Sequence, residues 1–287
     1  MDGASTAIVP WWSFTKSLIA VAVLRLAEQG RLALDVPLDD FPYTPRDLLQ
    51  HRAGVADYSG IADYHAGAAQ GDTPWSESEL LQRVLPDRLL FKPRSHWAYS
   101  NVGYFLLRRL VERTCGTDLS FALHDLVLAP LGLTSARLAQ SRSDMHITAF
   151  AGGRTYDPGW VFHGLVIGPV AEAALALHRL LRSDLIGPAS RAALTDCYPI
   201  GQETIAGRPW VTTGYGLGLM MGTMQHPRIE KPLKLIGHTG AGPGSVGAVY
   251  HAPDDRWQRT IAVFTSGADQ GLVEQAMLEQ FQFPRFS

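Results

Sequence analysis

A serine and a lysine three residues apart near the start of the chain are the pair most suited to chemistry. They form Ser13-Phe14-Thr15-Lys16, in a chain that has four lysines. Residues 13–29 are expected to form a helix with Ser13 as its N-cap, so that one face carries both side chains. A buried lysine amine with a lowered pKa can remove the proton of a serine hydroxyl. The pair therefore indicates a nucleophile and its base, against the alternative of a helix cap followed by a surface lysine.

A phenol and an amide follow in the short motif Tyr99-Ser100-Asn101, which holds the only asparagine of the chain. A tyrosine beside an ammonium group loses its proton more easily, so Tyr99 is expected to transfer a proton to a leaving group. The Asn101 amide can bind both the lysine and a substrate carbonyl. The alternative is that Asn101 acts only as the N-cap of the helix expected over residues 101–114.

His238-Thr239-Gly240 ends a short apolar run and precedes Ala241. Gly240 leaves room for a substrate against the strand edge, and the backbone N–H groups of Ala241 and Ser13 can form an oxyanion hole. His238 and Thr239 can bind a carboxylate or assist proton transfer. A catalytic His238 predicts activity that rises with pH near its ordinary pKa of about 6.5. The alternative is a structural strand that runs into a turn.

Composition narrows the classes of function. The 287 residues are 46% hydrophobic with a formal net charge of −2, so the chain can build a large core and shows no basic stripe for nucleic acid. The histidines lack metal-ligand spacing, and neither a metal nor a cofactor is expected. Residues 1–12 contain no secretory signal, and the longest apolar run, residues 18–24, is too short to span a bilayer. A cytoplasmic protein without a membrane partner is therefore expected.

The apolar pattern predicts a buried helix followed by a mostly helical middle. Residues 18–26 are apolar almost all round, so the helix over residues 13–29 should be central. Thr44 before Pro45 marks a helix start, and Ser76 with Glu79 forms a capping box. The remaining expected helices are 44–53, 76–85, 101–114, 118–128, 168–182 and 269–281.

After about residue 205 the pattern changes to short β-type runs separated by turn signals, which predicts an antiparallel meander. The expected strands are 215–220, 234–240, 246–251 and 260–265. This order fits an α/β lobe made of residues 1–35 and 166–287, with a mostly helical lobe of residues 36–165 inserted into it. The active site is expected between the two lobes.

Four longer stretches resemble the serine β-lactamase and penicillin-binding-protein superfamily, and its class C-like branch in particular. Residues 46–55 (RDLLQHRAGV) are similar to the pattern R-D-L-L-x-H-x-S-G-L, and residues 91–104 (FKPRSHWAYSNVGY) resemble F-x-P-G-x-x-W-x-Y-S-N-x-G-Y. Residues 130–133 resemble P-L-G-M, and residues 237–244 resemble G-H-T-G-G-x-P-G. The branch includes β-lactamases, DD-peptidases, family VIII carboxylesterases and D-amino-acid peptidases. The resemblance runs from about residue 10 to the end.

This resemblance implies an α+β, β-lactamase/transpeptidase-like fold, in which helices and a helical lobe flank an antiparallel sheet. The family's roles fall on Ser13 as the acylated nucleophile, Lys16 as its base and Tyr99 as the partner in proton transfer. The implied substrate-binding elements are Asn101, His238, Thr239 and Gly240, with the N–H of Ala241 in the oxyanion hole.

His238 stands where class C β-lactamases have lysine, so the leading hypothesis is a serine hydrolase, an esterase or amidase acting on a small substrate. One alternative is a DD-peptidase-like or β-lactam-binding enzyme. Another is a non-catalytic binding module on the same scaffold.

A shortened N-terminus is also expected, because only 12 residues precede Ser13 where relatives place a helix and two strands. The strand expected over residues 260–265 would then have a free edge, which favours association. We expect either that residues 1–9 fold back over this edge or that a second subunit covers it in a homodimer.

Overall fold

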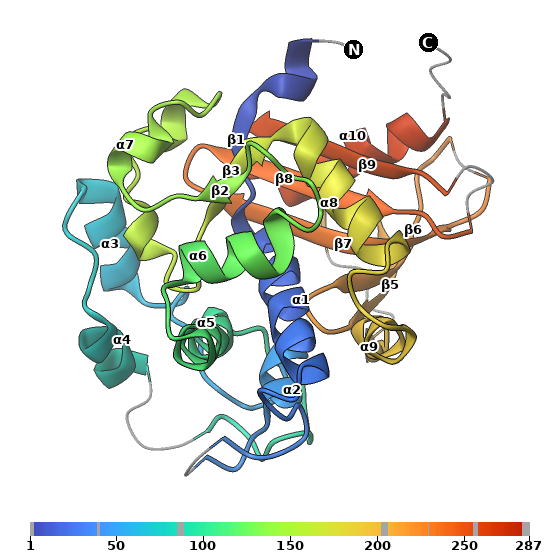
Figure 1. The fold of residues 1–287 in the computed structure, drawn as a ribbon. Helices are drawn as coiled ribbons and strands as arrows, with labels where there is room; N and C mark the ends of the chain where they lie inside the picture. The colour runs from blue at the N-terminus through green and yellow to red at the C-terminus, as the bar shows by residue number, and fades with distance from the viewer. Residues whose placement is uncertain are drawn as a thin grey trace.

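In the computed structural model, helices surround two antiparallel sheets (Figure 1). The structure describes residues 3–38, 41–84, 89–201, 206–228, 230–254 and 258–282. One sheet has six strands in the order β4-β5-β6-β7-β8-β9, and the other has three in the order β1-β3-β2. The strands are β1 (Ile8–Pro10), β2 (Arg137–Leu138), β3 (Val166–Pro169), β4 (Tyr198–Gly201), β5 (Trp210–Tyr215), β6 (Met220–Met224), β7 (Leu233–Gly242), β8 (Ser245–His251) and β9 (Thr260–Ser266). The expected α+β class is confirmed.

Both faces of the six-stranded sheet are covered. Along β8, Val246, Ala248 and Tyr250 join one apolar cluster with helix α10, whereas Val249 belongs to the cluster on the other face. This alternation follows from the two-residue period of a strand. Helix α8, which crosses the front of the sheet in Figure 1, packs against β8 and β9. The helices are α1 (Thr15–Glu28), α2 (Pro45–Leu49), α3 (Ala62–Gln70), α4 (Glu77–Val84), α5 (Asn101–Cys115), α6 (Leu119–Leu123), α7 (Arg142–Met145), α8 (Val170–Arg182), α9 (Pro188–Leu194) and α10 (Gln270–Gln282).

Helix α1 is the central helix that its all-round apolar character predicts. Residues 18–24 are fully buried, and α1 packs against α5, α6 and α9. Its start differs from the expectation, because a short 3-10 turn (Trp12–Phe14) precedes it and the helix begins at Thr15. Ser13 is therefore not the N-cap, and its hydroxyl is left free to contact other side chains.

The helix caps in the middle of the chain largely follow the sequence. Thr44 and Asp47 form a capping box around Pro45, and the backbone N–H of Glu79 donates to the Ser76 hydroxyl. Helix α5 is capped by Ser100, whose hydroxyl accepts the N–H of Gly103 at 3.0 Å. The alternative of Asn101 as an N-cap was therefore wrong, which leaves the Asn101 side chain available to the site.

Several expected elements have different bounds. The helix expected to end before Gly54 is α2, which ends at Leu49, and the helix expected over residues 118–128 is α6, which ends at Leu123. Residues 215–220 were expected to form one strand, but β5 ends at Tyr215 and β6 begins at Met220, so residues 216–219 form the turn between them. Gly218 in this turn has φ +77°, and its backbone lies so close to α1 that a Cβ would meet the Ala20 methyl at 2.7 Å. The helix expected from residue 168 begins at Val170, because β3 occupies the preceding residues.

The N-terminal segment does not cover the edge of β9. Ile8–Pro10 pairs with Val166–Pro169 in the small sheet, so the expectation that residues 1–9 fold back over β9 was wrong for the described residues 3–9; residues 1 and 2 lie outside the described part of the chain. The next residue extends this pairing, because the backbone N–H of Trp11 donates to the Val166 carbonyl at 2.8 Å. The segment that leads to Ser13 is therefore held by the three-stranded sheet. The alternative, a second subunit at this edge, stays a prediction, as does the division into two lobes.

Candidate active site

Ser13 lies on a strained turn held against strand β7. Trp12 has φ +42°, a left-handed conformation that costs a non-glycine residue about 1–3 kcal/mol. The Trp12 indole N–H donates to the Ser245 hydroxyl at 2.9 Å, which fixes the turn to β8. A Cβ on Gly240 would lie 2.6 Å from the Ser13 nitrogen. Glycine at 240 is therefore what lets the β7 backbone lie directly against the backbone of Ser13.

Lys16 is fully buried one helical turn after Ser13. Its Nζ lies 3.2 Å from Ser13 Oγ, 2.7 Å from Asn101 Oδ1 and 3.1 Å from His163 Nε2. Burial lowers the pKa of Lys16 from 10.5 to about 7, against an opposing attraction from Asp57. A large fraction of Lys16 is therefore the neutral amine near pH 7, as a general base requires.

His163 orients this amine, and the sequence pattern did not single it out. Burial, followed by the charge of Lys16, lowers the pKa of His163 well below 6.5, so the ring is neutral. A neutral amine has two N–H donors and one lone pair. If Asn101 Oδ1 and His163 Nε2 accept the two N–H groups, the lone pair is left for the hydroxyl of Ser13.

We expect His163→Leu, which removes the acceptor, to lower kcat about 10–100-fold with little change in KM, because the Lys16 lone pair loses its orientation. His163→Gln retains an acceptor oxygen and should stay within about fivefold of the wild type. Steady-state kinetics with an ester, supported by thermal unfolding, measures both variants. Equal losses in the two variants would assign His163 to packing alone.

Asp57 fixes the orientation of Asn101. The Asn101 backbone N–H donates to Asp57 Oδ1 at 2.7 Å, and its side-chain Nδ2 donates to Oδ2 at 3.2 Å. The amide oxygen must therefore face Lys16, while the second Nδ2 hydrogen can reach a substrate carbonyl. Asp57 carries no local sequence signal, because its role arises only when the loop after α2 meets the start of α5.

Tyr99 also contacts the nucleophilic candidate Ser13. Its hydroxyl donates to Ser13 Oγ at 3.0 Å, and Lys16 Nζ lies 5.1 Å from the centre of its ring. Burial raises the pKa of Tyr99 well above 10, so the expectation that the neighbouring ammonium makes this phenol more acidic was wrong. Tyr99 is therefore protonated near neutral pH and can act as a proton donor, whereas Lys16 can act as a base.

His51 holds the loop that carries Tyr99 through a hydrogen bond and a ring contact. It has φ +58°, and its Nδ1 accepts the backbone N–H of Ser100 at 3.1 Å. Its ring centre lies 4.3 Å from that of Tyr99. The histidine of the RDLLQHRAGV stretch thus sets the position of the phenol.

His238 on β7 faces the site as a neutral ring. Its Nδ1 lies 2.7 Å from the carbonyl of Thr239, which can only accept, so Nδ1 carries the proton and Nε2 accepts from the Tyr215 hydroxyl at 2.9 Å. Burial, followed by the charge of Lys16, lowers the pKa of His238 to about 3. The expectation that its titration near pH 6.5 controls activity is therefore wrong.

Thr239, Gly240 and Ala241 continue β7 past the serine. The Thr239 hydroxyl donates to Glu274 Oε1 at 2.5 Å, a contact with helix α10 that the sequence did not suggest. Ala241 borders the cleft together with Ser13. A role for the Ala241 and Ser13 N–H groups as an oxyanion hole stays a prediction.

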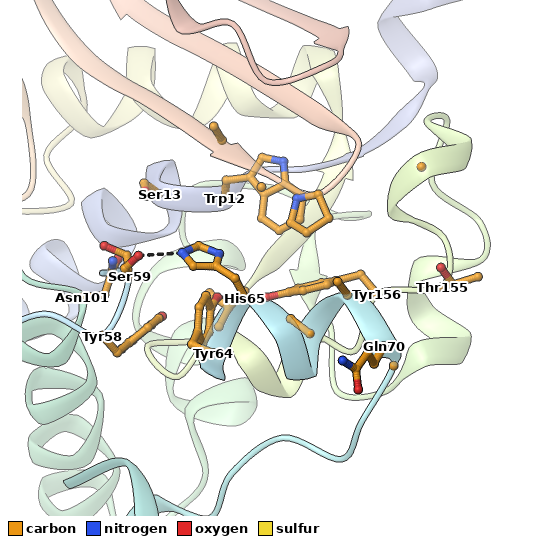
Figure 2. A pocket seen from close by; sticks show the side chains of 18 of the residues that line it. Trp12, Ser13, Tyr58, Ser59, Tyr64, His65, Gln70, Asn101, Thr155 and Tyr156 are labelled. Atoms are coloured by element: carbon orange, nitrogen blue, oxygen red, sulfur yellow. Dashed lines mark hydrogen bonds between the residues drawn. The ribbon is translucent and has the colours of Figure 1, made fainter. Parts of the chain in front are cut away.

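The cleft has two arms that meet at Ser13, Asn101 and Ala241. The wide arm is a cavity of about 700 Å³ with aromatic walls that include Trp12, Tyr58, Tyr64 and Tyr156. Figure 2 shows these rings around the cavity, with His65 Nε2 bonded to the Ser59 carbonyl at 2.7 Å. The narrow arm, about 390 Å³, runs beside the sheet and is lined by residues that include Trp97, Tyr99, Arg208, Trp210, Tyr215, His238 and Thr239.

No helix among the described residues is long and apolar enough to cross a membrane. In the same part of the chain, no group of three or more His, Cys, Asp or Glu side chains is placed to hold a metal ion.

Comparisons with known proteins identify the family of the chain. Residues 5–280 match the family model described as Beta-lactamase. A penicillin-binding protein of Bacillus subtilis (strain 168) is 30% identical over 159 residues, which cover 50% of this chain and 34% of the relative. Esterase EstB of Burkholderia gladioli is 29% identical over 201 residues, which cover 61% of this chain and 49% of the esterase. The chain thus spans a third to a half of the length of these curated relatives.

Solved structures extend the likeness to the whole fold. A D-stereospecific amidohydrolase from Streptomyces sp. has a TM-score of 0.77 and 21% identity, and the alignment covers 96% of this chain and 86% of that one. The β-lactamase-like fold predicted from the motifs is therefore confirmed. The family match extends over nearly all of the sequence, from before Ser13 to within helix α10. The chain belongs to the beta-lactamase family.

Proposed function

We propose that this protein is a serine hydrolase that forms an acyl-enzyme on Ser13 and acts on a small ester or amide. One observation carries the proposal: Lys16 Nζ and Tyr99 Oη lie 3.2 and 3.0 Å from Ser13 Oγ, although they come from different parts of the chain. A hydroxyl between a neutral amine and a protonated phenol has both a base and a proton donor within reach.

Acylation begins when neutral Lys16 takes the proton of Ser13 and Oγ bonds to the substrate carbonyl carbon. The oxyanion lies between the backbone N–H groups of Ser13 and Ala241. The bond to the leaving group then breaks, and Tyr99 gives that group its proton. Lys16 then returns the proton that it took from Ser13 to the Tyr99 oxygen, which restores the neutral amine and the phenol. Water attacks the acyl-enzyme in the reverse sequence of proton transfers and regenerates Ser13.

The arms divide the substrate between them. Tyr99 lines the narrow arm and not the wide one, so the leaving group occupies the narrow arm and the acyl group the wide arm. The aromatic walls and the volume of the wide arm favour an acyl group with apolar surface. The names of the relatives, an esterase and an amidohydrolase, support the same reaction class.

A matched ester and amide test the bond preference. We expect p-nitrophenyl butyrate to be hydrolysed with a kcat/KM at least about 100-fold above that of butyryl p-nitroanilide, because an ester needs less help from a proton donor. Spectrophotometric release of the nitro product measures both. Faster turnover of the anilide would make the protein an amidase, and turnover of neither would leave a binding module as the better hypothesis.

The DD-peptidase-like or β-lactam-binding alternative uses the same Ser13 chemistry. Its support is the penicillin-binding relative. Labelling by a fluorescent penicillin, measured beside ester turnover, distinguishes it, because a β-lactam-binding enzyme would retain the label on Ser13.

A further inference from the structure

A carboxylate lies behind the narrow arm and takes no part in the reaction described above. Glu274 is on helix α10, and its side chain is 0% exposed. Its oxygens accept from the Trp210 indole N–H at 3.2 Å, from Arg208 Nε at 2.9 Å and from the Thr239 hydroxyl at 2.5 Å. Arg208 Nη2 also donates to it. Three groups that line the narrow arm are thus held by one buried acid.

The hydrogen bond to Glu274 uses the hydroxyl hydrogen of Thr239, so this hydrogen does not point into the cleft. A threonine hydroxyl has one hydrogen, and here that hydrogen is donated to Glu274. The Tyr250 hydroxyl, 2.8 Å away, must then donate to Thr239 rather than accept from it. Thr239 therefore has no hydrogen to offer to an anionic group in the narrow arm, contrary to the expectation that it can bind a carboxylate.

The same acid cancels the positive charge of the arm. Arg208 is the one cationic side chain among the described residues that line the narrow arm, and it is 15% exposed. Its fork-like pairing with Glu274 leaves the two together without net charge. His238, which also lines this arm, is neutral, because its Nε2 accepts from Tyr215 and its Nδ1 donates to a carbonyl.

We propose that Glu274 is a specificity-determining residue that restricts the narrow arm to leaving groups without a carboxylate. A carboxylate placed there finds no net positive charge, no hydroxyl proton from Thr239 and a second carboxylate behind both. An uncharged leaving group can still accept from the Arg208 N–H groups that Glu274 leaves free. The inference rests on the proposed function, because it assigns the leaving group to this arm.

Two acetyl esters that differ in one group test the inference. The leaving groups are the neutral 4-hydroxybenzamide and 4-hydroxybenzoate, which has nearly the same shape but carries a carboxylate. Each enzymatic rate is divided by the rate of hydroxide-catalysed hydrolysis of the same ester, which corrects for the difference in intrinsic reactivity. We expect the wild type to prefer the benzamide ester by at least about 30-fold in kcat/KM, because a like charge across a desolvated contact is costly. A wild-type preference below about threefold would overturn the inference whether or not any variant folds.

Glu274→Gln keeps the shape of the side chain but releases the charge of Arg208. We expect this variant to lose most of the discrimination, to within about threefold, mainly through faster turnover of the benzoate ester. The matched control is Glu279→Gln, which removes a charge from a half-exposed position of the same helix and should keep the wild-type ratio. A folded Glu274→Gln protein with the wild-type ratio would contradict the assignment.

A binding measurement separates this inference from the proposed function. NMR titration of the wild type with free 4-hydroxybenzamide and 4-hydroxybenzoate requires no turnover. The amide should bind more tightly to the wild type, and the two affinities should come within about threefold of each other in Glu274→Gln. If neither ester is hydrolysed but the affinities follow this pattern, the reaction is wrong and the charge assignment stands. Equal or tighter benzoate binding to the wild type would refute the charge assignment.

Discussion

Ser13→Ala should lower kcat/KM for p-nitrophenyl butyrate by at least about 10⁴-fold, the scale on which serine enzymes lose activity when the nucleophile is removed. The loss is expected because Lys16 Nζ and Tyr99 Oη both lie within hydrogen-bond distance of Ser13 Oγ. The substitution removes one hydroxyl oxygen that lines the cleft, and it leaves the strained turn at Trp12 intact. Thermal unfolding should therefore stay near that of the wild type.

Ser95→Ala is the matched control for this substitution. Its hydroxyl is exposed and bonds to the Lys92 carbonyl at 2.7 Å, away from the cleft. It should retain wild-type turnover. Activity in a correctly folded Ser13→Ala protein that approaches the wild-type value would remove Ser13 from the mechanism.

Lys16→Met should change activity and stability in opposite directions. Loss of the base is expected to lower kcat about 10³-fold. The folded-state pKa of Lys16 is about 7 and its unfolded value is 10.5, so the unfolded chain binds more protons between these pH values, and stability rises with pH across that window. Methionine removes this penalty, which amounts to roughly 3–5 kcal/mol at and below pH 7. Chemical denaturation at pH 7 and 10 measures the gain.

The control for charge alone is Lys92→Met, at an exposed position. It should change neither activity nor the pH dependence of stability. A Lys16→Met protein that is both less active and less stable at pH 7 would show that Lys16 is an ammonium held by the fold rather than a base.

The same group should control the pH profile. Activity requires the neutral amine, so kcat/KM is expected to rise with pH through about 7. The lowered pKa values of His51, His163 and His238 leave those rings neutral across this range. Asp57→Asn should move the rise to lower pH, because the attraction that raises the pKa of Lys16 is removed. If kcat/KM rises at the same pH in Asp57→Asn as in the wild type, the rise is due to the titration of a group other than Lys16.

The motifs predicted the groups that touch the nucleophile because each lies in a short pattern. Ser13 and Lys16 are three residues apart on one turn of chain, and Tyr99 and Asn101 flank a helix start. A local pattern of this kind survives folding, because helix geometry fixes the relation between its members. The strand that carries His238 was also predicted from a local pattern, because the apolar run that precedes His238 is continuous.

The supporting residues could not be predicted in this way. Asp57 and His163 reach the site from segments far from Ser13 in sequence, and each is a single polar residue without a pattern. Glu274 sits in a helix whose sequence shows only that one face is apolar, and its partner Arg208 is 66 residues away. The charge states also depended on burial, which explains why the expectations for Tyr99 and His238 failed.

The acyl-enzyme itself is the most direct test of the central claim. The protein is mixed with a fluorophosphonate or a slowly hydrolysed ester, quenched in acid and digested, and the mass of the peptide that contains Ser13 is measured. The account predicts one adduct per chain, on Ser13, which is absent from Ser13→Ala and forms much more slowly in Lys16→Met. An adduct on another residue, or ester turnover by the wild type with Ser13 unmodified throughout, would contradict it.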